Sequence, residues 1–323
     1  MSEPVLSIDD VAVHFGGRGG LFARPAPAVR AVDGVSLAID KGETLGLVGE
    51  SGCGKSTLSN ATLGIVPLTR GTIRVMGRQV DATNRAELRA MRADVQMVFQ
   101  DPALSLNPRL SIGEAIGEPL RVRGIAVGKA LSSRVERLLG DVGLEPDHAG
   151  RFPHQFSGGQ RQRVVIARAL ALEPALVVCD EPVSALDVSV RAQILNLLVE
   201  LQRRRGMSYL FVSHDLAVVR HIADRIAVMY LGRLVETASR DTLFQAPKHP
   251  YTRALLAAAP EPDPAIQRAK RRQTLDGELP SPTLVQPGCA FAARCTLATD
   301  LCRRERPELT ERADGSQAAC HHA

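Results

Sequence analysis

Residues 49–56, with the sequence GESGCGKS, restrict the fold of this chain more than any other feature. They follow the apolar run 44–48, which predicts a short strand, and they lead into a predicted helix that begins at Lys55. In such a segment the glycines let successive backbone N–H groups converge on phosphate oxygens, and the helix adds the partial positive charge of its N-terminus. The flanking strand and helix weigh against a chance glycine-rich turn. We therefore predict a nucleoside-triphosphate site in which Lys55 neutralises the β and γ phosphates and Ser56 ligates Mg²⁺.

Asp180 and Glu181 end a second apolar run, residues 176–179, which predicts a strand covered on both faces. A carboxylate at the end of a buried strand is costly unless it serves a cation, so we expect Asp180 to hold the Mg²⁺ shell. Glu181 is predicted to point to the other face of the strand end and to accept a proton from an attacking water. The alternative is a solvated turn before Pro182, and the phosphate loop in the same chain weighs against it.

Ser157-Gly158-Gly159-Gln160 predicts the start of a helix that continues to about Ala171. Ser157 and Gln160 fit a capping box. Two residues without side chains expose N–H groups at the helix N-terminus, which makes a second anion site. Because one chain already has a complete phosphate loop, this site becomes useful if it presses on a nucleotide held by another subunit. The alternative is an ordinary capped helix.

The remaining chain alternates predicted strands and helices, which indicates an α/β fold with a central, mostly parallel sheet. A half-exposed strand at 5–15 precedes a Gly- and Pro-rich loop at 16–27, and residues 104–155 have the spacing of a helical insertion. After about Leu243 prolines become frequent, which predicts a linker and then a small cysteine-containing tail. Further predicted elements are strands at 209–213 and 226–229 and a helix marked by Val190, Ile194, Leu197, Leu198 and Leu201.

Composition limits the classes to which the chain can belong. Its 323 residues allow two domains, and with 3% aromatics the core must come mainly from Val, Leu, Ile and Ala. The net charge is +5, but the basic clusters, such as 203–205 and 270–272, are short and lack interleaved aromatics. We therefore expect no nucleic-acid groove. No run approaches the ~18 apolar residues of a membrane span, and the N-terminus lacks a signal-peptide pattern. We expect a soluble chain that reaches a membrane only through partners.

Together these motifs resemble those of the ABC-type ATPases, with a Walker A segment at 49–56, a signature at 156–160 and a Walker B segment at 176–181. The resemblance implies a P-loop ABC-ATPase domain with a mostly parallel central sheet, an antiparallel β edge and a helical subdomain at about 104–165. Other residues that match motif positions are Gln100 of the Q-loop, Asp187 of the D-loop, the switch histidine His214 and Phe15 as the adenine-stacking aromatic, for which a core position is the alternative.

Within the ABC-type ATPases, the chain most resembles the ATPases of oligopeptide/dipeptide importers. It rests on Gln100-Asp-Pro, on Ser-Leu-Asn-Pro at 105–108 and on His-Pro-Tyr-Thr-Arg-Ala-Leu-Leu at 249–256, and it covers about residues 5 to 320. Such importers pair two paralogous ATPases; Val183-Ser184 resembles one, whereas the other usually has Thr-Thr there. The resemblance implies a heterodimer with a second ABC ATPase subunit, peripheral at the cytoplasmic face of the cell (inner) membrane. The dimer would dock on two transmembrane permeases, and an extracytoplasmic solute-binding protein would choose the solute.

The same resemblance implies which residues act in ATP hydrolysis. Glu181 and His214 would position and activate the attacking water, and Gln100 would sense metal or water. Mg²⁺ would be held by Ser56, Gln100 and Asp180. ATP binding would close two subunits over their nucleotides, and hydrolysis would reopen them. The residues expected to bind ATP are Phe15, Gly49, Ser51, Gly52, Cys53, Gly54, Lys55, Ser56, Thr57, Gln100, Asp180, Ser157, Gly158, Gly159, Gln160 and Asp187.

Six cysteines without a secretory pattern predict reduced thiols or metal ligands rather than disulfides. Cys53 and Cys179 are expected to be small packing residues. The other four, spaced C-x5-C-x6-C-x17-C, suit a tetrahedral zinc site or an iron–sulfur cluster, although the wide spacing disfavours zinc. The resemblance implies a [4Fe-4S] cluster in at least some family members, and unligated thiols in a docking tail are the remaining alternative. These four are Cys289, Cys295, Cys302 and Cys320.

The leading hypothesis is the ATP-hydrolysing subunit of an importer for oligopeptides or dipeptides. Residues 1–243 would form its nucleotide-binding domain and 244–323 its transporter-type C-terminal region. An importer ATPase for nickel, glutathione or an antimicrobial peptide is an alternative, because the residues that contact solute lie on other polypeptides. A soluble ABC ATPase acting on nucleic acid or ribosomes is another, but those usually carry two nucleotide domains or a long coiled-coil insertion. A metal-binding regulatory protein, with the tail as its functional part, is the third.

Overall fold

The computed structural model describes residues 3–16, 27–258, 281, 283–284 and 286–323. Residues 17–26 of the loop predicted at 16–27, most of the proline-rich linker and the basic cluster 270–272 lie outside these residues. The chain divides into two compact units, described separately below: unit 1 comprises 1–7, 38–43 and 74–211, and unit 2 comprises 8–37, 44–73 and 212–323. The unit boundaries fall within the strands β1 (Leu6–Phe15), β2 (Val29–Ile39), β4 (Arg70–Val75) and β8 (Ser208–Ser213).

Asp180 ends one of two neighbouring parallel strands of unit 1. In β6 (Val95–Val98) and β7 (Leu176–Asp180), Val95 lies opposite Leu176 and Val98 opposite Cys179. The first four residues of β7 are buried, which confirms the strand predicted from the apolar run. The short strand β5 (Arg78–Gln79) pairs antiparallel with the end of β4, as expected for an antiparallel edge.

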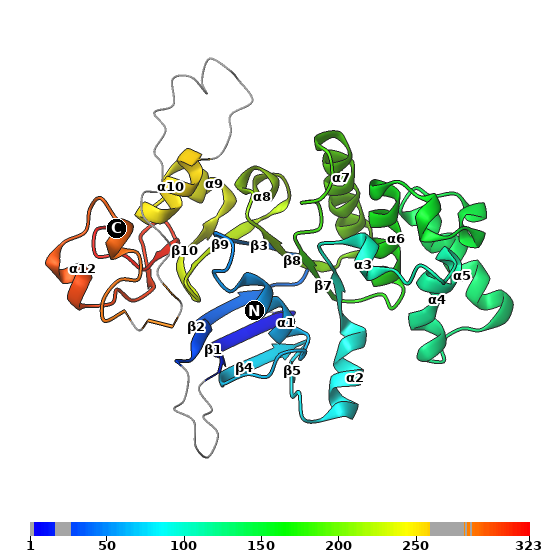
Figure 1. Ribbon diagram of the computed structural model, residues 1–323, viewed down its shortest axis with the longest axis horizontal. Coiled ribbons are helices and arrows are strands. Elements are labelled where there is room, and N and C mark those ends of the chain that lie inside the picture. Colours follow the sequence, from blue (N-terminus) through cyan, green and yellow to red (C-terminus); the bar gives the residue numbers. More distant parts are fainter. Residues whose placement is uncertain (1–2, 17–26, 259–280, 282, 285) are drawn as a thin grey trace. The chain divides into compact units, whose positions relative to one another are not determined.

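Three helices of unit 1, α4 (Ile112–Val122), α5 (Gly128–Asp141) and α6 (Gly158–Leu170), pack against one another (Figure 1). The buried apolar side chains of α4 and α5 confirm the helical spacing predicted for residues 104–155. The 3-10 turns η1 (Pro146–Gly150) and η2 (Pro153–Gln155) lie between α5 and α6. The other helices of this unit are α2 (Arg85–Asp94), α3 (Pro102–Ser105) and α7 (Val188–Arg205).

The sheet of unit 2 has the strand order β11-β12-β10-β9-β3. All five residues of β3 (Thr44–Val48) are buried, and the strand runs parallel to β9 (Arg225–Tyr230). The neighbours β10 (Arg233–Ser239), β12 (Gln317–Ala318) and β11 (Thr310–Glu311) are antiparallel. Because the last two strands come from the chain's C-terminal end, the predicted tail is partly built into the same sheet as the strand before the phosphate loop.

The helices of unit 2 correct the predicted linker. The helix α10 (Pro250–Ala258) lies where a linker was predicted after about Leu243, so that prediction is wrong for these residues. Proline is compatible with the first position of a helix, where its missing N–H has no partner to lose, and its frequency was therefore a misleading signal. The other helices of this unit are α1 (Lys55–Thr62), α8 (Leu216–Ile222), α9 (Arg240–Gln245), α12 (Asp300–Arg304) and the 3-10 turn η3 (Ala292–Arg294).

The cores are aliphatic, as the composition predicted, but all three tyrosines of the chain are also fully buried. The hydroxyl of Tyr209 donates to the carbonyl oxygen of Leu198 at 3.1 Å, which satisfies its polar end. Tyr230 and Tyr251 pack together with Phe291 in unit 2, at ring-centroid distances of 4.7 to 5.4 Å. Among the described residues, the helices are all too short or too polar to cross a membrane.

Candidate nucleotide-binding site

The loop between β3 and α1 has a backbone that only glycine allows. A Cβ on Gly54, whose φ is 108°, would stand 2.0 Å from the carbonyl oxygen of Ala31. A Cβ on Gly49 would stand 2.2 Å from the carbonyl oxygen of Met229. Helix α1 begins after Gly54 without a side-chain cap, so no capping side chain competes for the N–H groups of its first turn. Such a helix N-terminus attracts anions, which is the property that a phosphate loop needs.

Lys55 lies inside this loop and is 5% exposed. Its Nζ donates to the carbonyl oxygens of Gly49 at 2.7 Å and Glu50 at 3.0 Å, and it lies 3.7 Å from Sγ of Cys53. Burial raises the pKa of the Cys53 thiol in spite of the Lys55 charge, so Cys53 is a neutral, buried residue, as predicted for a packing role. Ser56 follows in the first turn of α1, with an exposed side chain.

Two residues far along the chain hold this loop, and sequence reasoning did not identify them. The N–H of Glu50 donates to the hydroxyl of Tyr251 at 2.9 Å. Arg294 donates to both carboxylate oxygens of Glu50, at 2.8 and 3.0 Å. Tyr251 lies in the segment that marked the importer resemblance, but no local pattern connects it with a residue 201 positions earlier.

Gln100 and Glu181, two residues predicted to be catalytic, are in contact in unit 1. Nε2 of Gln100 donates to Oε2 of Glu181 at 3.2 Å. Glu181 directly follows β7 and has a φ of 48°, a left-handed conformation that is strained for a residue with a side chain. The carbonyl of Glu181 accepts from the hydroxyl of Ser184 at 3.0 Å, which stabilises this turn. Asp180 is the last residue of β7 and is half-buried. Gln100 can therefore orient the Glu181 carboxylate.

The signature segment has the predicted capping box. Oγ of Ser157 accepts from the N–H of Gln160 at 3.3 Å, and Oε1 of Gln160 accepts from the N–H of Ser157 at 3.0 Å. Gly159 is buried, and a Cβ there would stand 2.4 Å from Cγ1 of Val190 in α7. Its lack of a side chain therefore serves the packing of α6 on α7. Ser157 and Gly158 are exposed and remain accessible to an anion.

The remaining residues predicted to bind nucleotide lie at the ends of strands and helices. Asp187 caps α7, where its Oδ1 accepts from the N–H of Val190 at 2.9 Å; this hydrogen bond, with that from Ser189, lowers the pKa of Asp187. His214 is exposed between β8 and α8. Phe15 ends β1 and is 44% exposed, so it is not a core aromatic.

The four C-terminal cysteines line one small cavity of unit 2, together with His249, His321 and His322. Burial raises the pKa of Cys289 and Cys295, and the neighbouring thiols raise it further. Within the part of the chain that is described, however, no group of three or more Cys, His, Asp or Glu residues could hold a metal ion. The four thiols therefore line one cavity without forming a metal coordination set in the described residues.

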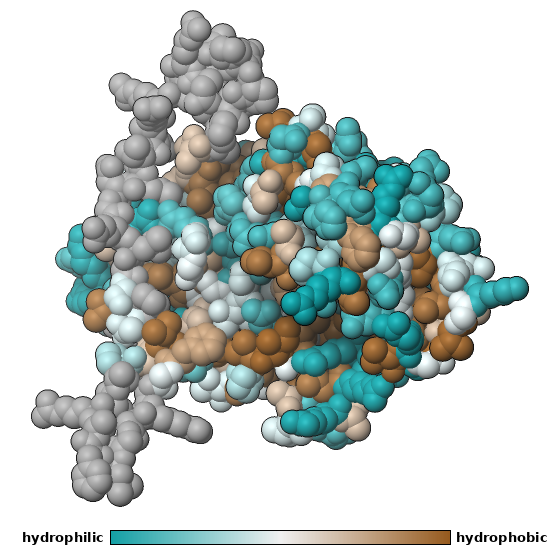
Figure 2. Space-filling view, turned by 45° about the vertical axis from the view of Figure 1, so that its right-hand side comes forward, coloured by the Kyte–Doolittle hydropathy of each residue, from teal (hydrophilic) through white to brown (hydrophobic). Residues whose placement is uncertain are grey.

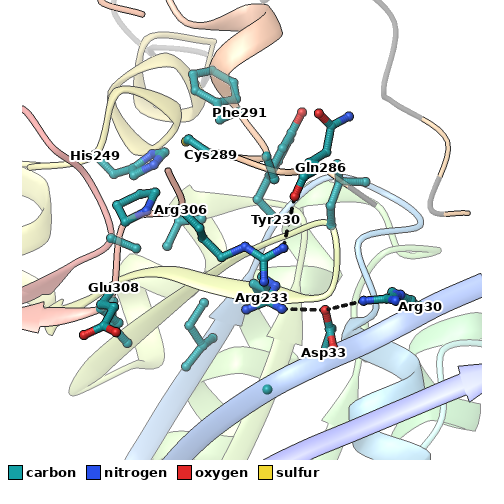
Figure 3. A pocket seen from close by; sticks show the side chains of 18 of the residues that line it. Arg30, Asp33, Tyr230, Arg233, His249, Gln286, Cys289, Phe291, Arg306 and Glu308 are labelled. Carbon is teal, nitrogen blue, oxygen red and sulfur yellow. Dashed lines mark hydrogen bonds and ion pairs between the residues drawn. The ribbon is translucent and has the colours of Figure 1, made fainter. Parts of the chain in front are cut away.

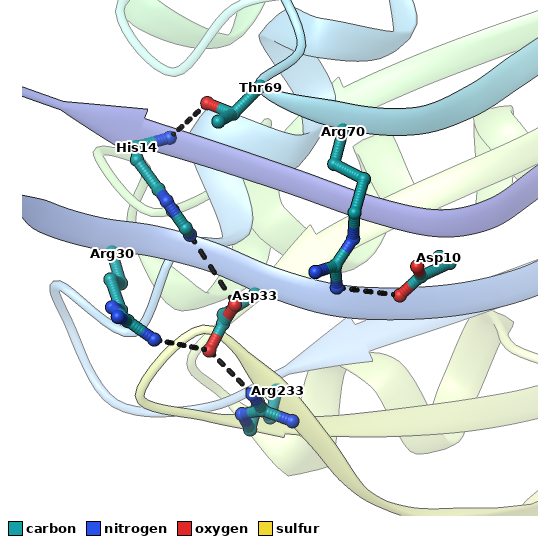
Figure 4. Close-up of polar contacts among 7 residues, drawn as sticks. All are labelled: Asp10, His14, Arg30, Asp33, Thr69, Arg70 and Arg233. Carbon is teal, nitrogen blue, oxygen red and sulfur yellow. Dashed lines mark hydrogen bonds and ion pairs between the residues drawn. The ribbon is translucent and has the colours of Figure 1, made fainter. Parts of the chain in front are cut away.

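A second cavity of unit 2, about 420 Å³, is lined by three arginines, Arg30, Arg233 and Arg306 (Figure 3). The Asp33 carboxylate lies 2.5 Å from Arg233, 3.6 Å from Arg30 and 3.4 Å from Nε2 of His14 (Figure 4). Burial alone would raise the pKa of Asp33, but Arg233, Arg30 and His14 together lower it. Since no residue predicted to bind ATP lines this cavity, it is separate from the phosphate loop.

Two protein families match the chain. The family described as "ABC transporter" matches residues 32–184, and "Oligopeptide/dipeptide transporter, C-terminal region" matches residues 235–302. The oligopeptide transport ATP-binding protein OppF of Escherichia coli is 51% identical over 308 residues, which cover 94% of this chain and 92% of that protein. The di/tripeptide transport ATP-binding protein DppF of Pseudomonas aeruginosa is 48% identical over 323 residues, which cover 99% of this chain and 98% of that protein.

Two solved structures show the fold. The structure of cbiO1 from Clostridium perfringens, part of the ABC transporter complex cbiONQ, has a TM-score of 0.66 and 26% identity over 76% of this chain and 92% of that one. The dimeric post-hydrolysis structure of the ATP-binding cassette MJ0796, bound to ADP and Pi, has a TM-score of 0.64 and 31% identity over 73% of this chain and 98% of that one. These matches confirm the predicted α/β ATPase fold.

Proposed function

Because the chain belongs to the ATP-binding subunits of oligopeptide/dipeptide ABC transporters, we propose that it hydrolyses ATP to drive the uptake of oligopeptides or dipeptides across the cytoplasmic membrane. The observation that carries the proposal is the 51% identity, over 94% of the chain, with an oligopeptide transport ATP-binding protein. Residues 1–243 are proposed as the ATPase domain, with a helical subdomain at about 104–165, and 244–323 as the transporter-type C-terminal region.

The proposed substrate is ATP with Mg²⁺. Lys55 and the N–H groups of the loop would bind the β and γ phosphates, and Ser56 and Asp180 would ligate the metal. The buried ammonium group of Lys55 and the uncapped start of α1 support this assignment. Gln100 is proposed to contribute to the metal shell, and the exposed Phe15 to stack on adenine.

Glu181 is proposed as the general base that takes a proton from the attacking water, while His214 positions that water. The Gln100 amide, 3.2 Å from the Glu181 carboxylate, supports a role for Gln100 in orienting the base. The strained φ of Glu181 is a further support, because strained residues concentrate at functional sites.

The site is proposed to be completed by a second ATPase subunit, whose signature segment would close over the nucleotide. In this chain the exposed Ser157 and Gly158, with Gln160 and Asp187, would do the same for the partner subunit's nucleotide. The dimeric state of the solved ATP-binding cassette bound to ADP and Pi supports this arrangement. We propose that the second subunit is a paralogue, since Val183-Ser184 resembles one member of the usual pair.

Two transmembrane permeases and an extracytoplasmic solute-binding protein are the other proposed partners, with the ATPase peripheral at the cytoplasmic face of the inner membrane. Apolar side chains exposed in and between the helices after Gln100 support a docking surface; they include Leu104, Val122 and Val127, which are 86%, 62% and 67% exposed. Figure 2 shows hydrophobic patches among hydrophilic side chains on one face of the molecule. Exposed apolar patches of this kind are typical of surfaces that contact another protein.

A [4Fe-4S] cluster, or else zinc, remains a proposal for the C-terminal cysteines, supported only by their gathering around one cavity. Four thiolates are the usual ligand set of either group. Anaerobic purification followed by iron, sulfide and zinc analysis tests it. A brown protein with acid-labile sulfide supports the cluster, a colourless protein with one zinc supports the alternative, and a metal-free protein refutes both.

The experiment that tests the proposed function replaces Glu181 by glutamine and measures binding and turnover of Mg-ATP. Glu181→Gln should retain ATP binding and lose at least about a hundredfold in turnover, because the amide cannot take the proton. In Mg-ATP the variant should form a stable dimer with its companion ATPase. Glu87→Gln, on the exposed face of α2, is the matched control and should hydrolyse ATP at the wild-type rate. Wild-type turnover in Glu181→Gln would overturn the assignment of the base.

The solute requires a separate test, because the residues that contact it lie on other polypeptides. Growth of a deletion strain on defined dipeptides and oligopeptides should depend on the restored gene. Normal growth on peptides, with a loss of nickel, glutathione or antimicrobial-peptide uptake, would favour those solutes instead.

A further inference from the structure

The phosphate loop is held at Glu50, through both the backbone N–H and the side-chain carboxylate of this residue. Glu50, the second residue of the loop, donates its N–H to Tyr251 at 2.9 Å and accepts two hydrogen bonds from Arg294, at 2.8 and 3.0 Å. Two parallel N–H···O bonds between a guanidinium and a carboxylate fix direction as well as distance, and they are stronger than neutral hydrogen bonds. Both partners belong to the C-terminal region, 201 and 244 residues away along the chain.

This contact is protected from water. The Arg294 side chain is 5% exposed and that of Glu50 is 22% exposed. The Arg294 guanidinium lies 6.0 Å from the ring centroids of Tyr230 and Phe291. The hydrogen bonds to Glu50 raise the pKa of Arg294, whose guanidinium is in any case always protonated in proteins. A shielded, permanently charged pair keeps its geometry better than an exposed one, which salt and side-chain motion weaken.

Tyr251 is itself held rigidly. It is fully buried, and its ring packs against Tyr230 at 4.7 Å and Phe291 at 5.4 Å. Its N–H donates to Nδ1 of His249 at 3.1 Å. Burial lowers the pKa of His249 to about 4, so at neutral pH its ring is neutral, and Nδ1, which accepts this hydrogen bond, is the nitrogen without a proton. The hydroxyl of Tyr251 therefore has a defined position relative to the loop.

From Glu50 the contacts continue to the residue that would bind phosphate. Nζ of Lys55 donates to the carbonyl oxygen of Glu50 at 3.0 Å and to that of Gly49 at 2.7 Å. A shift of Glu50 therefore moves a carbonyl oxygen that accepts from Lys55. It also moves the N–H groups of the loop residues next to Glu50. A loop that must present several N–H groups to one phosphate loses affinity when its backbone is free to move, because ordering it costs conformational entropy.

We propose that Arg294 and Tyr251 are positioning residues of the ATP site: they hold Glu50, and through it the phosphate loop and Lys55, in the conformation that binds the phosphates. The C-terminal region would then be part of the nucleotide site as well as a transporter-specific extension. The inference rests on the proposed function, since it assigns these residues to the same ATP site. Neither residue would touch the nucleotide.

The test measures Mg-ADP affinity, the KM and kcat for Mg-ATP, and the melting temperature of the full chain. Arg294→Met keeps the length and the apolar packing of the side chain but removes its charge, and it should weaken Mg-ADP binding about five- to tenfold and raise KM more than it lowers kcat. Arg294→Lys restores a charge without the paired geometry and should recover part of the affinity. Tyr251→Phe should weaken binding about threefold, because the N–H of Glu50 loses its acceptor.

Arg312→Met is the matched control. Arg312 lies in the same C-terminal region, and its guanidinium donates to the carbonyl oxygens of Ala318 and Cys320 rather than to Glu50. It should lower the melting temperature without changing nucleotide affinity. If Arg294→Met and Arg312→Met lower the melting temperature alike and both bind Mg-ADP as the wild type does, Arg294 is only structural and the inference is overturned.

The outcome for the wild type separates this inference from the proposed function. A wild-type chain that binds and hydrolyses Mg-ATP supports the proposed function whatever Arg294→Met does. A wild-type chain that binds no nucleotide overturns the proposed function and the positioning role with it. If Arg294→Met does not fold, the affinities of Arg294→Lys and Tyr251→Phe decide, and wild-type values in both overturn the inference.

Discussion

Unit 2 contains two arginine–carboxylate clusters that use the same chemistry at different places. In one, Glu50 accepts two hydrogen bonds from the single guanidinium of Arg294. In the other, Asp33 is shared by Arg233, Arg30 and His14 at the edge of a cavity. The first carboxylate belongs to a loop whose shape decides whether phosphate can bind. The second belongs to the strand β2 and links it to the hairpin of β9 and β10.

The comparison indicates that the role of an arginine–carboxylate pair depends on the segment that carries the carboxylate. It does not depend on the strength of the pair. Both carboxylates are at least partly buried and both have arginine partners. A strand already held by its ladder hydrogen bonds gains stability from such a pair. A glycine-rich loop, which has no strand ladder, gains a defined conformation. The first cluster should therefore be detected in nucleotide affinity and the second in the free energy of unfolding.

The largest effect is expected for Asp33→Ala. Removing the shared carboxylate leaves Arg233 and Arg30 close together without their common partner, and we expect the free energy of unfolding to fall by about 2 to 3 kcal/mol. Mg-ADP affinity should change less than about twofold. Urea unfolding and nucleotide titration measure the two quantities, with Asp10→Ala, which breaks an exposed pair, as the control. A large loss of affinity in Asp33→Ala would remove the distinction between the clusters.

The next effect is expected for Glu50→Gln, which keeps the shape of the side chain but removes its charge. It should weaken Mg-ADP binding about threefold to tenfold, or roughly 0.7 to 1.4 kcal/mol, with a smaller change in unfolding free energy. Combined with Arg294→Met, the loss should be smaller than the sum of the two single losses, because both changes break one pair. Strictly additive losses would show that the two residues act independently.

A pH dependence should separate the Asp33 cluster further. The pKa of Asp33 is lower in the folded chain than in the unfolded one, so its contribution is fully present above the unfolded pKa. It is lost as the pH falls through the lower folded pKa. The difference in unfolding free energy between the wild type and Asp33→Asn should therefore shrink as the pH falls below about 4. A difference that stays constant to pH 3 would contradict the assigned ion pair.

The smallest effect is expected for an exposed pair of the same unit. Arg70 lies 2.8 Å from Asp10, and the two side chains are 57% and 63% exposed. Arg70→Met should change the unfolding free energy by less than about 0.5 kcal/mol, and less still at high salt, because solvent and ions screen exposed pairs. Unfolding measured at low and at high salt tests this. A loss comparable to that of Asp33→Ala would mean that burial does not distinguish these pairs.

Much of the nucleotide-binding machinery could be predicted because its signals are local. The strand β3, the start of α1 at Lys55, the end of β7 at Asp180 and the capping box of α6 each follow from about ten consecutive residues. Apolar runs, glycine positions and capping residues act over one or two turns of chain, so their consequences are visible in the sequence.

Two features could not be predicted from local signals: the helix α10, which lies where a linker was predicted after Leu243, and the packing role of Gly159. The helix α10 is held by the burial of Tyr251, and Gly159 makes room for Val190 of another helix. Both depend on which side chains pack together in the folded chain. Neither the frequency of proline nor the presence of a glycine pair predicts that packing.

The sequence by itself determined that the chain has a glycine-rich loop between a strand and a helix, a buried strand that ends in Asp180, and the motifs of a transporter ATPase. Only the tertiary structure decided that Gln100 meets Glu181, that the C-terminal strands join the sheet of β3, and that Arg294 and Tyr251 hold Glu50. The physical reason is distance along the chain. A pair 244 residues apart leaves no periodic or compositional signal, because its geometry arises only when the intervening chain has folded.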